Sequence, residues 1–282
     1  MTRTRRPATA LILALVAVLL AATGVALDRL RGPGDAMGVV AIEPSYTFMP
    51  VAAPAKVAAK PKAPKVVKRP AAAKIACPGL PRVGSSAAVA AKAVVPRVKV
   101  YDRPDGRVSR VLTNPTVEGQ PLHALVHERQ GVWLKIQLVS RPNGATGWVR
   151  ITNFAQYQTP YRIVVQRCSR KLTVLKFGQP VWERPVAVGK ASTPTPAGDF
   201  FVDFITPMRC CAYGPVMLSV SGFSNVIFQF GKNGTGQIAI HGTNADWSVG
   251  SAASNGCIRM HNADVTALSK MVPAGTPVTI VD

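Results

Sequence analysis

Short β-strand patterns interrupted by turn residues are the feature of this sequence that most restricts its fold. Between residues 93 and 159, runs rich in Val, Ile, Leu and Thr are separated by turns such as 104–106 and 141–144. The pattern continues through residues 160–282, where apolar and polar residues alternate at 162–167. Alternation with a period of two places successive side chains on opposite faces of a sheet. The sequence therefore predicts a mainly β protein.

One segment, Asn262–Met271, has a helical pattern instead. Asn262 is expected to cap its N-terminus, and Asp264 lies in the first turn, where a carboxylate favours the positive end of the helix dipole. We therefore expect a small β-barrel-like domain at 93–159, followed by a second β domain with one short helix at 160–282.

The positive charge is concentrated in one tract. The chain has 34 Lys and Arg against 13 Asp and Glu, and residues 51–76 carry seven of the basic residues and no acid. This Ala/Pro/Lys tract lacks periodicity, so residues 28–92 are predicted as an extended linker. A solvated spacer and a cationic tether lying against an anionic cell wall both fit it. Nucleic acid is not expected as a partner, because no aromatic platform is interleaved with the basic residues.

The N-terminus has the pattern of an export signal. Three arginines within the first six residues precede an uncharged run, Pro7–Leu27. A run of about 20 residues is long enough to span a bilayer, whereas Gly24 and Ala26 are small enough to permit cleavage. Residues 1–27 are thus either a signal-anchor in the cytoplasmic membrane or a cleaved signal peptide. In both cases the rest of the chain is expected outside that membrane, in the periplasm or cell wall.

An odd number of cysteines leaves at least one thiol free or bonded to another molecule in an exported chain. Four of the five cysteines lie outside the motif described next, and they allow up to two disulfides in three pairings. The pairing stays open, although the adjacent Cys210 and Cys211 are not expected to bond to each other. The five cysteines are Cys77, Cys168, Cys210, Cys211 and Cys257.

Cys257 and His241 form the constellation that can carry chemistry. Cysteine attacks as its thiolate, and a neighbouring imidazole can take the proton and stabilise the thiolate as an ion pair. Gly256 permits a tight turn just before Cys257, which can aim successive backbone N–H groups at a developing oxyanion. Arg259 shares the side of Cys257 in an extended backbone, where it can lower the thiol pKa, hold a carboxylate or pair with Asp264.

Metal binding is not predicted. His123 and His127 lie four residues apart and share one face of an expected strand. No Cys or carboxylate accompanies them at ligand spacing, and the cysteines lack the paired spacing of a zinc site.

The residues around Cys257 resemble the signature of the L,D-transpeptidase family of peptidoglycan enzymes. The segments IHGT and SNGCIRMHNADV match its His-Gly pair and its Ser-x-Gly-Cys-x-Arg motif. Upstream, VGKASTPTPAGDF matches the Thr-Pro-x-Gly-x-Phe stretch of the family. Many members have His where this chain has Asn255, which removes a second imidazole from the pocket. In the preceding domain, Gly147-Trp148-Val149 resembles the closing strand of the bacterial Src-homology-3-like barrels that are attached to wall enzymes.

This resemblance implies a β-sandwich catalytic domain and a role for each matching residue. Cys257 is expected as the nucleophile and His241 as the general base, with the Gly242 carbonyl orienting the imidazole. The backbone N–H groups of Asn255, Gly256 and Cys257 are expected to form the oxyanion hole. Residues expected to contact the substrate are Thr243, Ser254 and Arg259.

The implied function is an L,D-transpeptidase that forms a thioester with a tetrapeptide stem of peptidoglycan and passes it to an amine acceptor. No cofactor or metal is implied, and carbapenem β-lactams are implied as covalent inhibitors. Two alternatives stay open: an L,D-carboxypeptidase that uses water as acceptor, and a non-catalytic cell-wall-binding module. A papain-type peptidase is disfavoured, because its Cys lies early in the chain on a helix N-terminus and its His downstream, whereas here His241 precedes Cys257.

Overall fold

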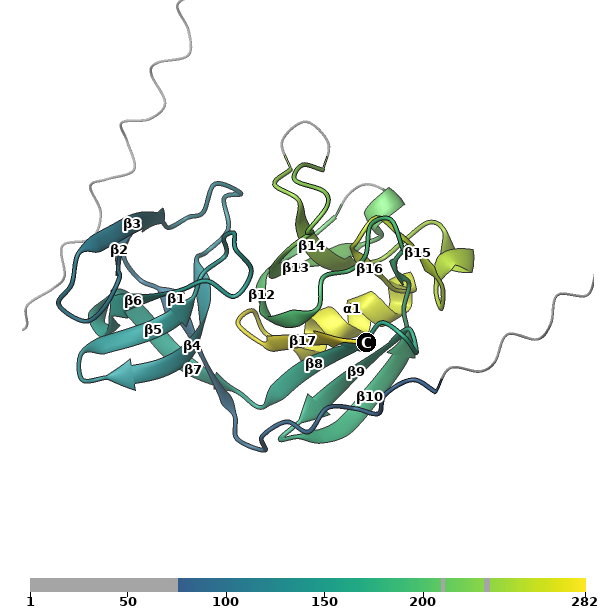
Figure 1. The fold of residues 1–282 in the computed structure, drawn as a ribbon, viewed down its shortest axis with the longest axis horizontal. Helices are drawn as coiled ribbons and strands as arrows, with labels where there is room; N and C mark the ends of the chain where they lie inside the picture. Colours follow the sequence, from purple (N-terminus) through teal and green to yellow (C-terminus); the bar gives the residue numbers. More distant parts are fainter. Residues whose placement is uncertain (1–75, 209–210, 231–233) are drawn as a thin grey trace, which may run out of the picture. The chain divides into compact units, whose positions relative to one another are not determined.

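The computed structural model describes residues 76–208, 211–230 and 234–282 (Figure 1). The predicted signal segment 1–27 and most of the predicted linker lie outside these residues. Within the described part of the chain, no helix combines the length and hydropathy needed to cross a membrane. The described residues belong to one compact unit.

The first part of this unit is a seven-stranded sheet with the strand order β3-β2-β6-β5-β4-β1-β7. Its interior is made of small and branched apolar residues, among them the fully buried Val98, Leu134 and Val149. The resemblance to Src-homology-3-like barrels stays a prediction. The strands are β1 Ala88–Ala93, β2 Arg97–Tyr101, β3 Val108–Thr113, β4 His123–Gln130, β5 Trp133–Gln137, β6 Thr146–Arg150 and β7 Phe154–Thr159.

Strand β1 lies inside the range predicted as linker, so the predicted boundary at residue 92 is wrong. β1 pairs antiparallel with both β4 and β7. Its buried residues are all alanines, and Ala90 and Ala91 are completely buried. Small side chains allow this close packing, but they give the segment the same composition as the Ala-rich tract before it.

The second part is built on an eight-stranded sheet with the strand order β10-β9-β8-β17-β12-β13-β14-β16. A parallel pair, β11 and β15, lies beside it, and the described residues contain three short 3-10 turns, η1 Ile151–Asn153, η2 Cys211–Tyr213 and η3 Asp246–Ser248. The prediction of a mainly β chain with one helix is confirmed for the described residues. The strands are β8 Tyr161–Gln166, β9 Lys171–Lys176, β10 Gln179–Pro185, β11 Val188–Gly189, β12 Gly198–Pro207, β13 Val216–Phe223, β14 Gln237–His241, β15 Ala252–Ser254, β16 Ile258–Arg259 and β17 Pro277–Val281.

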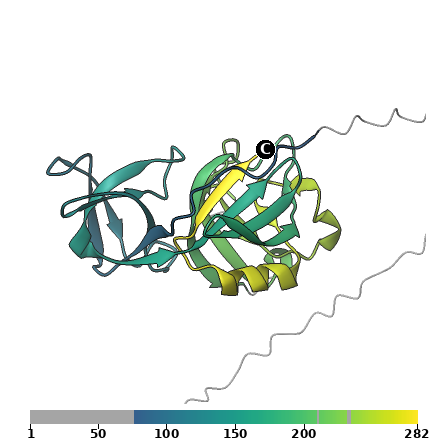
Figure 2. The same cartoon turned by 90° about the horizontal axis from the view of Figure 1, so that it is seen from below.

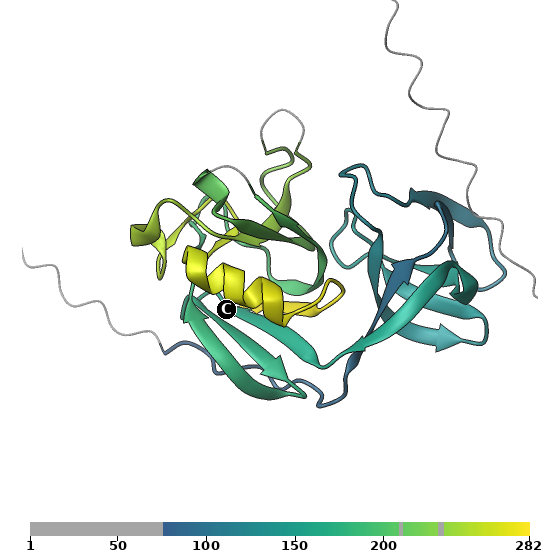
Figure 3. The same cartoon turned by 180° about the vertical axis from the view of Figure 1, so that it is seen from behind.

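Helix α1 spans Asn262–Met271, as predicted, and lies against the sheet (Figures 2 and 3). It buries Val265 and Leu268 in the core of this domain. The predicted N-cap is wrong, because His261 occupies that position and makes no capping bond with its side chain. The Asn262 carboxamide is used elsewhere: its oxygen accepts a hydrogen bond from the backbone N–H of Thr243 at 3.0 Å.

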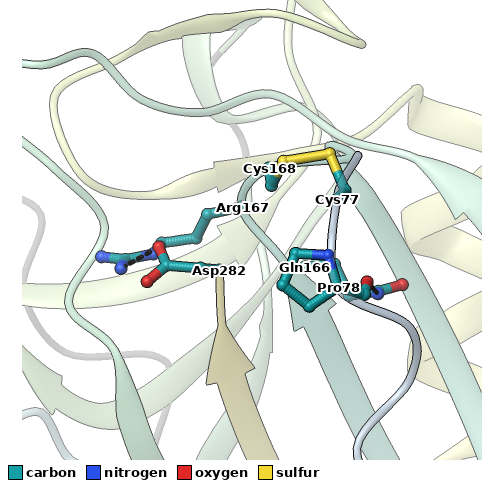
Figure 4. The surroundings of a disulfide bond; sticks show 6 residues. All are labelled: Cys77, Pro78, Gln166, Arg167, Cys168 and Asp282. Atoms are coloured by element: carbon teal, nitrogen blue, oxygen red, sulfur yellow. Dashed lines mark hydrogen bonds and ion pairs between the residues drawn. A yellow bond between two sulfur atoms is a disulfide. The ribbon is translucent and has the colours of Figure 1, made fainter. Parts of the chain in front are cut away.

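A disulfide links the segment before β1 to the turn after β8 (Figure 4). It joins Cys77 to Cys168, with 5.6 Å between their Cα atoms, and so resolves one of the pairings that the sequence left open. Beside it, the side chain of Gln166 donates to the carbonyl of Pro78 at 2.9 Å. Residues 77 and 78 are therefore held against the second domain by a covalent bond and a hydrogen bond.

The two sheets are also joined by the loop between β5 and β6. The guanidinium of Arg141 donates to the carbonyls of Ser224 and Ile227 at 2.8 and 3.2 Å. The side chain of Asn143 both donates to and accepts from the backbone of Phe223, at 2.9 and 2.8 Å. These bonds anchor the loop to the end of β13.

Candidate active site

Two short parallel strands bring the predicted catalytic residues to neighbouring positions. β14 ends at His241, and its Ile240 pairs in register with Ile258 of β16. Cys257 directly precedes Ile258, so it lies beside Ala239, and its thiol contacts the Ala239 backbone. Residues 239 and 241 share one face of β14, because side chains alternate along a strand. The sixteen-residue separation in sequence is thus closed by strand pairing.

The loop that carries Cys257 is held from inside by one hydroxyl. Ser254 is completely buried, and its Oγ donates to the carbonyl of Cys257 at 2.6 Å and accepts the N–H of Gly256 at 3.0 Å. Gly256 has φ of +120°, a conformation that side-chain-bearing residues rarely adopt. Ser254 is predicted to contact the substrate, but this geometry gives it a role in shaping the loop. One of the three predicted oxyanion donors, the Gly256 N–H, is already engaged by it.

His241 is buried and fixed in orientation. Its Nδ1 lies 2.6 Å from the carbonyl oxygen of Gly242, which requires the proton to be on Nδ1 and leaves the Nε2 lone pair as the acceptor. The ring of Tyr213 lies against the imidazole, with 4.7 Å between the ring centroids. The sequence patterns did not point to Tyr213, because it comes from a loop with no motif of its own.

Burial sets the charge state of both candidate catalytic groups. It lowers the pKa of His241 to about 4, opposed by the Gly242 carbonyl and reinforced by the positive charge of Arg259. Burial also raises the pKa of the Cys257 thiol, opposed by the Ala239 backbone and by Arg259. Both directions favour a neutral thiol and a neutral imidazole before the substrate arrives. This differs from the thiolate–imidazolium pair expected from the sequence, because burial disfavours the charged form of both groups.

The remaining predicted residues fall into different surroundings. Thr243 is 2% exposed, and its Oγ1 accepts the N–H of Ala245 at 3.0 Å, so it stabilises the loop after His241. Arg259 is half-buried and its charge reaches both His241 and Cys257. The considered ion pair between Arg259 and Asp264 is not formed.

Asp264 is bonded instead to Arg184, at 2.9 Å. Asn255, two residues before Cys257, is exposed. His261 pairs with Asp246 at 3.2 Å.

The two histidines of the first domain do not form a metal site. His127 Nε2 lies 3.3 Å from the side-chain oxygen of Gln137, and His123 Nδ1 lies 3.1 Å from the Pro121 carbonyl. In residues 76–282, leaving out the undescribed gaps, no group of three His, Cys, Asp or Glu side chains is arranged to hold a metal ion.

Comparison with known proteins agrees with this arrangement of the second domain. The YkuD family model, described as the L,D-transpeptidase catalytic domain, matches residues 160–280. A putative L,D-transpeptidase YkuD of Bacillus licheniformis is 41% identical over 121 residues, covering 43% of this chain and 66% of the relative. The putative L,D-transpeptidase YqjB of Bacillus subtilis is 36% identical over 129 residues, covering 44% of this chain and 72% of the relative.

Solved structures of similar proteins match more loosely. An L,D-transpeptidase from Mycobacterium smegmatis aligns at 17% identity with a TM-score of 0.34, covering 54% of this chain and 79% of that one.

The chain spans about two thirds of the length of the first curated relatives it matches. The YqjB relative is 36% identical and is covered over 72% of its length, and the family model matches the same part of this chain. The chain therefore belongs to the L,D-transpeptidase family.

Proposed function

We propose that this protein is an exported L,D-transpeptidase that cross-links peptidoglycan through a thioester on Cys257. The observation that carries the proposal is the pairing of β14 with β16, which places Cys257 level with Ala239, two residues before a buried imidazole whose Nδ1 is fixed on a carbonyl. This leaves Nε2 free to take the thiol proton, as a general base must.

The acylation step follows from the neutral pair. His241 Nε2 takes the thiol proton as Cys257 Sγ attacks the carbonyl of the third residue of a tetrapeptide stem. The oxyanion that forms is stabilised by backbone N–H groups of the loop before β16. The bond to the terminal D-Ala breaks, its amine leaves with the proton from His241, and a thioester remains.

The second half returns the enzyme to its starting state. The side-chain amine of a second stem attacks the thioester and gives a proton to His241, which passes it to the departing Cys257 sulfur. The product is a cross-link between two stems. Energy from the cleaved amide is conserved in the thioester, so the reaction runs outside the cytoplasmic membrane without ATP. Carbapenem β-lactams are expected to acylate Cys257 by the same attack on a carbonyl.

The test is intact-protein mass spectrometry on the purified protein with a tetrapeptide-stem muropeptide, and separately with a carbapenem. We expect an adduct on the peptide that contains Cys257, loss of D-Ala and a cross-linked dimer, all absent from Cys257→Ala. Shortened stems without dimers would identify an L,D-carboxypeptidase. Absence of any adduct, with retained binding to isolated sacculi, would identify a wall-binding module.

A further inference from the structure

Thr195 lies in the loop between β11 and β12 and contacts Gly256, in the loop that carries Cys257 (the nucleophile loop, residues 255–257). Its side chain is 1% exposed. The Oγ1 atom accepts the N–H of Gly189 at 2.8 Å and donates to the carbonyl of Gly256 at 2.9 Å. The hydroxyl therefore has one defined donor and one defined acceptor, and its hydrogen is committed to Gly256.

The carbonyl of Gly256 belongs to the same peptide unit as the N–H of Cys257. A trans peptide is planar, and its C=O and N–H point in opposite directions. Holding the carbonyl on Thr195 therefore fixes the direction of the Cys257 N–H, away from Thr195. Gly256 needs such a restraint, because a glycine near φ of +120° has neighbouring conformations that would turn this peptide.

We infer that Thr195 is a positioning residue, which orients the Gly256–Cys257 peptide so that the Cys257 N–H donates to the oxyanion formed during acyl transfer. The inference rests on the proposed function and adds a residue to its machinery. It also distinguishes between the predicted oxyanion donors. The Gly256 N–H is bonded to Ser254, whereas the Cys257 N–H is the one whose direction Thr195 controls.

The backbone of Thr195 is itself held by a hydrogen bond from Arg167. The guanidinium of Arg167 donates to the Thr195 carbonyl at 2.8 Å. The same guanidinium is ion-paired with Asp282 (Figure 4). Arg167 directly precedes Cys168, whose disulfide secures the turn after β8. The restraint on the nucleophile loop thus continues through Arg167 to a covalently fixed point of the second domain.

The test separates attack on a carbonyl from simple thiol reactivity. p-Nitrophenyl acetate acetylates Cys257 through an oxyanion: the Sγ–C bond forms, p-nitrophenolate leaves, and the thiol proton goes to His241. Iodoacetamide alkylates the same sulfur with loss of iodide and forms no oxyanion on the attacked carbon. Both rate constants are measured on the full chain for the peptide that contains Cys257, by mass spectrometry.

Thr195→Val removes the hydroxyl at nearly constant shape. We expect acetylation to slow by about tenfold or more, alkylation to stay close to the wild-type rate, and Thr195→Ser to restore acetylation. Thr193→Val is the matched control in the same loop. Thr193 donates to the Ser254 carbonyl at 3.2 Å, but this oxygen keeps a second donor in the backbone N–H of Lys190 at 3.0 Å.

Equal losses of acetylation and alkylation in Thr195→Val, or unchanged acetylation, would overturn the inference. If this variant does not fold, Thr195→Ala replaces it, and a failure of both to fold would show that Thr195 determines the fold and not the oxyanion site. Neither reagent resembles a stem peptide, so the outcome is independent of the proposed substrate. A wild-type protein that reacts with p-nitrophenyl acetate but never with a muropeptide would count against the proposed function alone.

Discussion

His241 Nδ1 lies 2.6 Å from the carbonyl oxygen of Gly242, the next residue in the chain. Because the bond joins adjacent residues, it depends on how the backbone turns at the end of β14. The turn is stabilised by Asn262, whose side-chain oxygen accepts the N–H of Thr243. The helix that follows the nucleophile therefore helps to orient the base.

This arrangement predicts the pH dependence of acylation. Burial lowers the pKa of His241 to about 4, so the neutral imidazole that acts as base persists until the pH falls to about 4. The rate constant for acetylation of Cys257 by p-nitrophenyl acetate should be level from neutral pH down to about 5 and fall below that. Cys257→Ala supplies the background rate. A fall centred between pH 6 and 7 would show that the imidazole keeps its ordinary pKa.

Gly242→Ala should slow acylation by about 10²-fold, because displacements near 1 Å at a catalytic group have effects of that size. A Cβ at this position would lie 2.2 Å from the Asn262 side-chain oxygen and 3.0 Å from the Gly214 Cα. Either the Asn262 carboxamide or the backbone of residue 242 must move, and both movements disturb the turn that orients His241. Gly84→Ala is the control, since a Cβ there meets nothing within 4 Å. Equal acetylation rates in the two variants would contradict this account.

The buried carboxyl of Asp203 should make the folded protein less stable as the pH rises from about 4 to about 6. Burial raises its pKa from 3.8 to about 6, reinforced by the charge of Glu118 and opposed by the hydrogen bond from Gln237. In this range the folded protein keeps a proton that the unfolded chain has released, so this contribution to stability is lost as pH rises.

Asp203→Asn cannot ionise, so it removes the buried negative charge that disfavours the folded state above about pH 6, while leaving an oxygen for Gln237. At pH 7.5 it should raise Tm by about 2–4 °C, the change that about 1 kcal/mol produces in a domain of this size. Thermal unfolding from pH 4 to 7.5 measures it, and a wild-type Tm that falls less steeply with pH than that of the variant would contradict the assignment.

Replacing both Cys77 and Cys168 by serine should lower the free energy of unfolding by about 2–5 kcal/mol. The disulfide closes a loop with a sequence separation of 91 residues, which restricts the unfolded chain strongly. Denaturant unfolding of the double variant measures the loss. The wild-type protein unfolded in the presence of a reductant should give the same value, and a double variant as stable as the oxidised protein would show that the bond is not formed.

The parts of the fold and site that the sequence predicted depend on local patterns. Helix α1 was predicted at its observed bounds, because its periodicity is contained in ten residues. Strand β1 was missed because its buried residues are alanines. Thr195 lies within a matched motif, but its bond to Gly256 joins residues 61 positions apart. Neither that contact nor the choice among three disulfide pairings leaves a local signal.

The disulfide also determines which part of the chain bears a mechanical load. All seven strands of the first sheet, β1 to β7, lie between Cys77 and Cys168. A pull applied to the chain ahead of Cys77 therefore passes through the S–S bond directly to the second domain at Cys168. The hydrogen-bonded strands of the first sheet form a side loop that carries none of the load, so this sheet stays folded under forces that would otherwise unzip it strand by strand.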